Sequence, residues 1–210
     1  FSDSSRAPVL TNRSRPTLKR ETFRTSREMD FLSKRELVTQ TGHAVKEWPL
    51  VIVKELIDNS LDACEETDVT PEIAVTADSA GITVEDNGPG LPESTLKGSL
   101  NFTVRASNRE AYVAPDRGAQ GNALKTLIPM PRVVDPEHGR LIVTAGGKQH
   151  VITCGTDPIS QRAVVNDDAS KVRRMRGTIV RIEWYERENA DGAVWPFPDL
   201  KALATGRHPT

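Results

Sequence analysis

The chain has 210 residues, which is enough for one substantial hydrophobic core with extensions, or for two small domains at most. Its 28 lysines and arginines nearly balance its 29 aspartates and glutamates, so the overall charge indicates neither a nucleic-acid binder nor a binder of acidic ligands. The distant cysteines Cys64 and Cys154 argue against a disulfide framework or a zinc site, and no apolar run approaches the roughly 20 residues that span a bilayer, so we expect a soluble protein of the reducing cytoplasm.

Residues 1–27 are predicted to form a basic, flexible arm. They contain seven lysines and arginines against Asp3 and Glu21, with few apolar residues to bury. A disordered tail is the simpler interpretation, and a contact with DNA phosphates or a dimer-exchange arm is the alternative. We expect a single globular domain over 28–190 and a C-terminal extension over 191–210.

Two helices are expected after the arm. The first begins with Ser26 as its N-cap and ends before Gly42. The second starts near Pro49 and runs to about Glu66. It contains VKELIDNSLDACEE (53–66), in which polar and apolar residues take opposite sides of the helix.

The polar side of this second helix carries Glu55, Asn59 and Asp62 within about 60° of one another, taking about 100° per residue. An amphipathic helix with an acidic, solvated edge is the simplest explanation of such a line. The segments that follow in the chain favour a different interpretation, in which this line of polar residues faces a bound ligand.

Later elements alternate between strands and short helices. A hairpin is predicted from 72–78 and 81–87, a short helix over 92–100, a long loop over 101–118 and a helix over 119–128 that the Pro129-Met130-Pro131 segment stops. Further strands are expected over 140–146, 148–155, 163–166 and 178–185. This order predicts an α+β fold, a two-layer sandwich with helices on one face of a mixed, mainly antiparallel sheet.

The segment VEDNGPGLP (84–92) places Asp86 at the end of a strand, directly before a turn with Gly88 and Gly90. A buried carboxylate can accept a hydrogen bond from an amino group, and glycines let the backbone approach a flat ring closely. Because this pattern is common in turns, it is by itself only weak evidence for a binding site.

The segment DRGAQGNALKTL (116–127) sets Gly118 and Gly121 ahead of a predicted helix. Free backbone N–H groups and the positive end of a helix dipole together suit a phosphate group. The segment is not a Walker loop, because no G-K-[ST] follows the last glycine.

Taken together, KELIDNSLDACEE, EDNGPGLP and RGAQGNAL resemble the GHKL ATPases, and within that group the B subunits of type IIB DNA topoisomerases. The resemblance covers roughly 28–185. It implies the Bergerat ATP-binding fold, ATP and Mg²⁺ as ligands, and slow hydrolysis that couples nucleotide state to homodimerisation. It also implies a DNA-cleaving A-type subunit and DNA as partners.

The resemblance also assigns roles to residues. Glu55 matches the general base that polarises the attacking water, and Asn59 matches the magnesium ligand. Asp86 matches the carboxylate that accepts the adenine amino group, above a pocket floor shaped by Gly88 and Gly90. A carboxylate and an amide one helical turn apart suit phosphoryl transfer, which asks a protein mainly to position water and neutralise charge.

The remaining assignments concern the phosphates and the far side of the base. Residues 101–118 match the ATP lid, with phosphate contacts expected from Gly118, Gln120 and Gly121. Thr178 matches a threonine near the adenine.

The sequence departs from the family at two places. Ala123 stands where the family has a third lid glycine, and no transducer domain with its phosphate-binding lysine precedes Thr210. We expect Arg105, Arg109 and Lys125 to be surface charges that do not replace this lysine. A nucleotide-gated interaction module without turnover is therefore an alternative. A histidine kinase is another, disfavoured because no glutamate follows His43.

Other residue types are assigned to structure. The four histidines are expected at the surface or in packing, Trp48, Trp184 and Trp195 in the core or at interfaces, and Cys64 as a small buried apolar residue. A second basic cluster could contact DNA, although a solvated turn is the favoured interpretation. It consists of Lys171, Arg173, Arg174 and Arg176.

Overall fold

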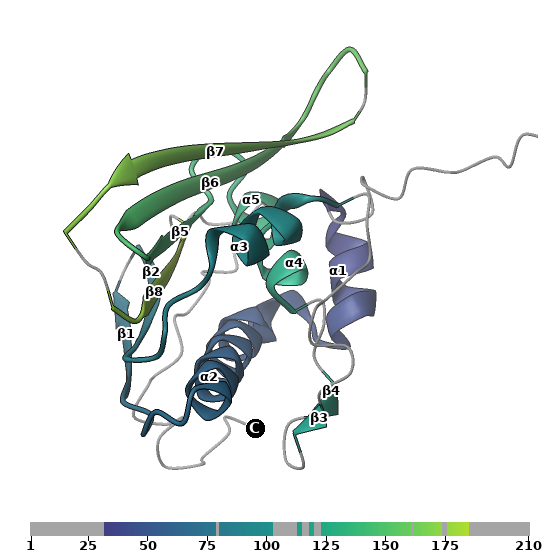
Figure 1. Cartoon of the computed structure of the whole chain (residues 1–210). Coiled ribbons are helices and arrows are strands. Elements are labelled where there is room, and N and C mark those ends of the chain that lie inside the picture. Colours follow the sequence, from purple (N-terminus) through teal and green to yellow (C-terminus); the bar gives the residue numbers. More distant parts are fainter. Residues whose placement is uncertain are drawn as a thin grey trace, which may run out of the picture.

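The computed structural model describes residues 32–78, 80–102, 113–114, 118–119, 123–160, 162–173 and 176–184. In this part of the chain, helices cover one face of a six-stranded sheet, which confirms the predicted α+β sandwich (Figure 1). The predicted arm 1–27 and extension 191–210 lie outside the described residues.

The strand order of the main sheet is β1-β2-β8-β5-β6-β7, and all of its pairs are antiparallel. The strands are β1 (Ile73–Asp78), β2 (Gly81–Asp86), β5 (Arg140–Ala145), β6 (Lys148–Thr156), β7 (Ala163–Lys171) and β8 (Thr178–Glu183). The last strand in the chain lies in the interior of the sheet, where Val180 pairs with Val84 on one side and Val143 on the other. This pairing brings the end of β2 next to the start of β8.

The helices are short except for one. They are α1 (Lys34–Thr41), the 3₁₀ turn η2 (Val45–Glu47), α2 (Trp48–Glu66), α3 (Glu93–Leu100), α4 (Ala123–Leu127) and α5 (Met130–Val134). A separate two-stranded ribbon consists of β3 (Val113–Ala114) and β4 (Gly118–Ala119). The first helix ends as predicted at Gly42, whose φ of 70° and N–H bond to Val38 O form a left-handed C-cap.

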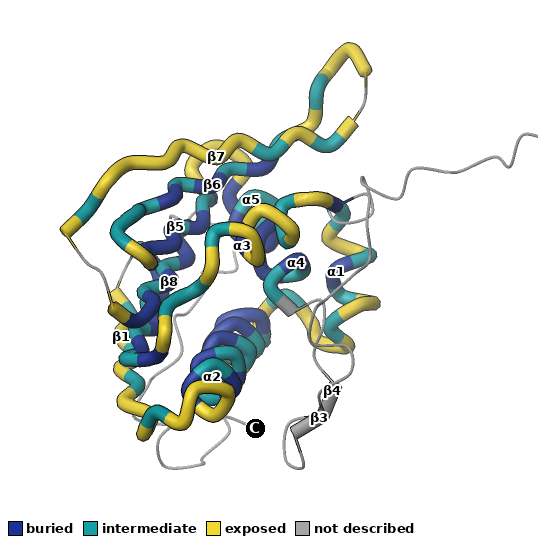
Figure 2. Tube along the Cα trace, in the orientation of Figure 1, coloured by how far each residue is buried: buried dark blue, intermediate teal, exposed yellow. Residues whose placement is uncertain are grey.

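The core lies between the helices and the sheet (Figure 2). Alternate residues of the strands face it, such as Ile82 and Val84 of β2, and Ile52 and Leu56 of α2 meet them. Trp48 and Trp184 are fully buried, as predicted, while Trp195 lies outside the described residues. Cys64 and Cys154 are both buried and free, and burial raises the pKa of the Cys154 thiol to about 12.

Three predicted boundaries were wrong. Of the described residues in the predicted helix 119–128, Ala119 lies in β4 and Ala123–Leu127 are helical. The helix α4 ends before the proline segment, as predicted, but that segment also begins α5, because proline is well suited to the first turn of a helix. The first helix described begins at Lys34, after the extended Ser33, so it is not continuous with the predicted start at Ser26, which lies outside the described residues. The strand β7 extends to Lys171, although its polar second half carries no apolar alternation, because β6 pairs with it over nine residues.

No helix among the described residues is long and apolar enough for a membrane crossing.

Candidate functional site

The predicted site centres on Asp86, which ends β2 and is 6% exposed. Its Oδ1 accepts hydrogen bonds from the backbone N–H of Gly88 at 2.9 Å and of Thr178 at 3.1 Å. Its Oδ2 lies 3.1 Å from the Ser60 hydroxyl on α2. Three different elements therefore hold this carboxylate in one orientation, and each presents a donor to it.

Gly88 and Gly90 line the turn after Asp86, as predicted. A Cβ on Gly88 would lie 3.1 Å from Asp86 Oδ1 and 3.3 Å from Cys64 Sγ, so a side chain there would crowd the carboxylate. Gly90 has a φ of +91°, which disfavours any other residue. The turn is fixed to the start of β8, because Gly177 N–H donates to Gly88 O at 3.1 Å.

The structure adds Ser60 to the site. Its buried hydroxyl lies 2.9 Å from Leu56 O, within its own helix, and close to Asp86. The sequence carried a signal for this contact, since Ser60 is a hydroxyl residue next to Leu56 on the apolar arc of the helix. This signal is weak in the sequence alone, because a serine in a helix often bonds only to the backbone of its own helix.

Glu55 and Asn59 lie one turn apart on the same helix, and both are half-buried. The contact between Ser60 and Asp86 packs the apolar arc of α2 against the end of β2, and Asn59, the residue before Ser60, lies about 100° away from Ser60 around the helix. Glu55 is about 7.5 Å along the helix axis from Ser60, at about 1.5 Å per residue. Glu55 and Asn59 thus lie on the helix that contacts Asp86, and their roles at the site stay predictions.

Other acidic groups on α2 are more enclosed than a solvated edge would be. Asp62 is 4% exposed and Asp58 is 9% exposed. Lys54 Nζ lies 2.8 Å from Asp58 Oδ2 and 3.3 Å from Glu55 Oε1. The hydrogen bond that Lys54 donates to Asp58 is the main reason that the pKa of Lys54 is raised, against the opposing effect of burial.

The predicted phosphate-binding segment is described only in part. Gly118 lies in β4, where it pairs with Ala114 of β3. Gln120, Gly121, Arg105 and Arg109 lie outside the described residues, so their roles stay predictions.

Lys125 was wrongly expected at the surface. It is 3% exposed, and burial lowers its pKa. The reason is that α4 contacts α1, α2 and α3, which enclose it on several sides.

The oxygen atoms of the polar side chains on α2 are suitable ligands for a hard cation such as magnesium. Magnesium prefers oxygen ligands and usually takes only one or two of them from the protein, the rest coming from water and substrate phosphates. The amide oxygen of Asn59 is a ligand of this kind. Within the described residues, no cluster of three or more His, Cys, Asp or Glu side chains could hold a metal.

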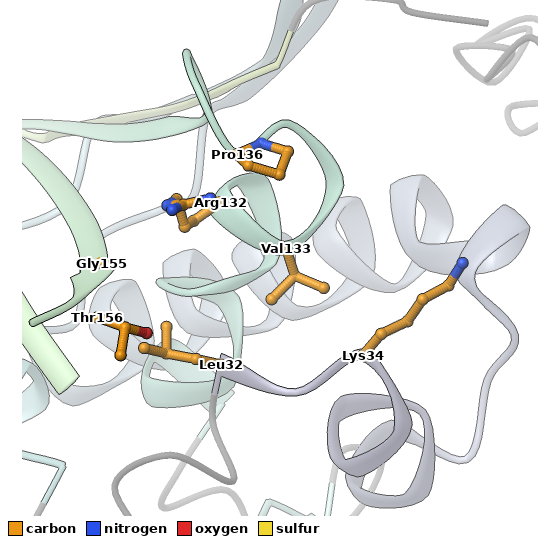
Figure 3. Close-up of a pocket in the computed structure, with 7 residues that line it drawn as sticks. All are labelled: Leu32, Lys34, Arg132, Val133, Pro136, Gly155 and Thr156. Atoms are coloured by element: carbon orange, nitrogen blue, oxygen red, sulfur yellow. The ribbon is translucent and has the colours of Figure 1, made fainter. Parts of the chain in front are cut away.

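A separate cavity of about 270 Å³ lies elsewhere on the molecule (Figure 3). Its wall comes from the residues around the start of α1, from α5 and the residues after it, and from the end of β6, where Arg132 Nε donates to Cys154 O at 3.0 Å. It is lined by Leu32, Lys34, Arg132, Val133, Pro136, Gly155 and Thr156. None of the predicted site residues lines it.

Comparison with known proteins gives a family match over the whole region of Asp86 and α2. The model of the family described as "Histidine kinase-, DNA gyrase B-, and HSP90-like ATPase" matches residues 45–186.

The similar curated proteins are B subunits of type 2 DNA topoisomerase 6. The protein from Thermococcus onnurineus is 26% identical over 139 residues, which are 63% of this chain and 24% of the relative. The one from Thermococcus gammatolerans is 30% identical over 67% of this chain and 23% of the relative. The one from Archaeoglobus fulgidus is 36% identical over 38% of this chain and 14% of the relative. The chain thus spans about a quarter or less of the length of these relatives.

Proposed function

Because the chain belongs to the family of histidine kinase-, DNA gyrase B- and HSP90-like ATPases, we propose that it binds ATP with Mg²⁺, hydrolyses it slowly and couples its nucleotide state to dimerisation. The chain is a GHKL ATPase domain similar to the B subunit of topoisomerase 6. The ligands, the reaction and the partners are the proposed part.

The observation that carries the proposal is the fixed carboxylate of Asp86. Gly88 and Thr178 hold it through backbone donors, and Ser60 connects it to the helix that bears Glu55 and Asn59. A carboxylate accepts a hydrogen bond from the amino group of adenine and repels the carbonyl that guanine has at that position. This geometry therefore supports adenine as the base.

The polar side of α2 is proposed to serve the triphosphate. Glu55 orients and polarises the attacking water, and Asn59 holds Mg²⁺ through its amide oxygen, while the bound metal neutralises charge on the phosphates. Gly118, Gln120 and Gly121 are proposed to donate backbone N–H groups to the phosphates.

The relatives' names supply the proposed partners. They are B subunits of a DNA topoisomerase, so we propose a second copy of this chain, an A-type subunit and DNA as partners. The proposed location is the cytoplasm, where the buried free thiols of Cys64 and Cys154 would stay reduced.

Phosphate release tests the proposed reaction. The wild-type chain should release phosphate from ATP only with Mg²⁺, and Glu55→Gln should release it at least about 100-fold more slowly, because general bases contribute about 10²–10⁴-fold. Glu55→Gln should still bind a non-hydrolysable ATP analogue. Wild-type turnover that does not depend on Glu55 would contradict its role as the base.

A second candidate function is nucleotide binding without useful turnover. Lys54 favours it, because its ammonium group lies 3.3 Å from Glu55 Oε1 and competes with a water for that carboxylate. Lys54→Ala should then raise phosphate release if Lys54 restrains an otherwise competent base. Tight binding of the analogue with no release in either protein would favour the binding module.

A further inference from the structure

Asn87 lies between Asp86 and Gly88, where β2 ends, and the proposed ATPase gives it no role. Its side-chain amide forms two hydrogen bonds to the connection between α2 and β1. Nδ2 donates to Thr70 O at 3.0 Å, and Oδ1 accepts from Glu72 N–H at 3.0 Å. A half-buried residue next to the carboxylate of the site is thus tied to a different part of the chain.

These two bonds continue the pairing of β1 with β2 beyond its last residues. Ile73 and Asp86 form the final pair of that ladder. Beyond it, a backbone carbonyl and a backbone N–H two residues apart both bind the amide of Asn87, as they would bind the backbone of a neighbouring strand. Because a side chain takes this place, the backbone of Asn87 can leave the sheet here and turn toward Gly88.

Cys64, near the end of α2, provides a third contact for the amide. Its Sγ lies 3.7 Å from Asn87 Oδ1, within range of a weak S–H hydrogen bond. Burial, and then the negative charge of Asp86, raise the pKa of the Cys64 thiol, so the thiol keeps the proton that it donates. Val69 N–H donates to Cys64 O at 2.9 Å, which fixes the connection to the same end of the helix.

The residue type at position 87 matches what the connection requires. An asparagine amide has the donor for Thr70 O and the acceptor for Glu72 N–H. A carboxylate would set an oxygen against Thr70 O and would add a negative charge next to Asp86. The side chain of Asn87 thus serves the connection, while its backbone joins the Asp86 carboxylate to the N–H of Gly88, which donates to it at 2.9 Å.

We propose that Asn87 is a positioning residue for base recognition, which fixes the backbone between Asp86 and Gly88 and with it the direction of the Asp86 carboxylate. This inference rests on the proposed binding of ATP and adds a residue that sets the preference for adenine. A carboxylate that can turn accepts less well from the amino group of adenine and repels the carbonyl of guanine less strongly. Asn87 acts through Asp86 and does not itself contact the nucleotide.

Amide hydrogen exchange of the full chain, measured by NMR without nucleotide, tests the positioning directly. In Asn87→Ala, the N–H groups of Gly88 and Thr178 should exchange about three- to tenfold faster, the factor that corresponds to one hydrogen bond, because both donate to the Asp86 carboxylate. The N–H of Val180, in the interior of the sheet, should keep its wild-type rate. Equal acceleration of all three groups, or no acceleration, would overturn the proposal.

Asn87→Asp is a second variant, which keeps the size of the side chain. It retains the acceptor of the amide and loses the donor, so the N–H groups of Gly88 and Thr178 should again exchange faster than in the wild type. Asn166→Ala is the matched control, because Asn166 is exposed on β7, and it should leave both rates unchanged. Wild-type rates in Asn87→Asp, or equally fast exchange in Asn166→Ala, would count against a specific role of the amide.

Titration calorimetry with non-hydrolysable ATP and GTP analogues tests the effect on the choice of base. Asn87→Ala should lower the preference for the ATP analogue by about three- to tenfold. In an Asp86→Asn background the same substitution should change neither affinity further, because both residues act on one contact. An unchanged preference, or losses that add, would contradict a role through Asp86. If the wild type binds no ATP analogue, the proposed function fails, and the exchange rates still decide whether Asn87 positions the carboxylate.

Discussion

At the scale of single residues, the buried carboxylate of Asp86 organises the site. Its donors come from a turn, a strand and a helix: Gly88, Thr178 and Ser60. The resemblance to the GHKL ATPases indicated Asp86, its glycines and Thr178 together, and the structure places Gly88 and Thr178 in contact with Asp86. It did not indicate Ser60, whose contact depends on how closely α2 approaches β2.

Ser60→Ala tests whether this hydroxyl positions the carboxylate. The variant should bind an ATP analogue about three- to tenfold more weakly, because a hydrogen bond contributes about 0.5–1.5 kcal/mol. Since Ser60 is proposed to act only through Asp86, the rate of phosphate release at saturating ATP should not change. Titration calorimetry and a phosphate-release assay measure the two quantities.

Ser99→Ala is the matched control, because among the described residues the Ser99 hydroxyl donates only to its own helix, at Thr95 O. It should leave nucleotide affinity unchanged. An equal loss of affinity in both serine variants would show that Ser60 has no specific role at Asp86.

Gly90 and Gly98 provide a second residue-scale prediction. Gly90→Ala should lower the free energy of unfolding by about 1–2 kcal/mol, because the φ of +91° places a side chain in a strained conformation. Gly98→Ala should raise it by about 0.5–1 kcal/mol, since Gly98 lies within α3 with nothing near its added Cβ. Urea unfolding of both variants measures the difference, and equal effects would contradict this account of the Gly90 turn.

At the scale of elements, periodicity was a good guide where an element is amphipathic. The α2 boundaries differ from the prediction by one residue, and the hairpin of β1 and β2 agrees closely, because both alternate apolar and polar residues with the helix or strand period. The same rule failed for the polar half of β7, which depends on its pairing with β6. It also missed α5, because the proline segment that follows α4 begins a further short helix.

The attachment of α3 to the sheet gives a pH-dependent prediction. Lys148 on β6, and then Lys97 on α3, lower the pKa of Glu93 from its usual 4.5 to about 2. A lowered pKa in the folded state stabilises the fold above pH 4.5, and this contribution disappears as the pH falls toward 2. The Tm of the wild type should therefore fall more steeply over this range than that of Glu93→Gln.

Glu72→Gln is the control for the Glu93 measurement. Glu72 is exposed and forms no ion pair with the described residues. Its variant should follow the wild-type Tm curve. If Glu93→Gln follows that curve as well, the two lysines do not hold α3 through this carboxylate.

At the scale of the whole molecule, the site depends on contacts between distant parts of the chain. The start of β8 reaches Asp86 across 92 residues of sequence, because β8 pairs with β2 and β5 in the interior of the sheet. Local patterns predict strands but not which strands pair, so this order could not come from periodicity alone. The resemblance to a family, which carries the order with it, supplied what local patterns lacked.

For the molecule as a whole, the family of the chain is established, and its ligands, reaction and partners are proposed. The chain is a GHKL ATPase domain that spans about a quarter or less of its topoisomerase relatives. The proposed recognition of adenine involves β2, β8 and α2, which are described, whereas the proposed phosphate contacts of Gln120 and Gly121 lie outside the described residues. The base end of the site is therefore the part on which a decisive measurement can be designed.

That measurement is titration calorimetry of a non-hydrolysable ATP analogue with Mg²⁺ against the wild-type chain, Asp86→Asn and the control Asp168→Asn, an exposed site on β7. The wild type and Asp168→Asn should bind alike. Asp86→Asn should bind at least about 100-fold more weakly, because an amide in place of the charged acceptor costs about 3 kcal/mol. Unchanged binding by a folded Asp86→Asn variant, or no binding by the wild type, would contradict the claim that this carboxylate reads the base of ATP.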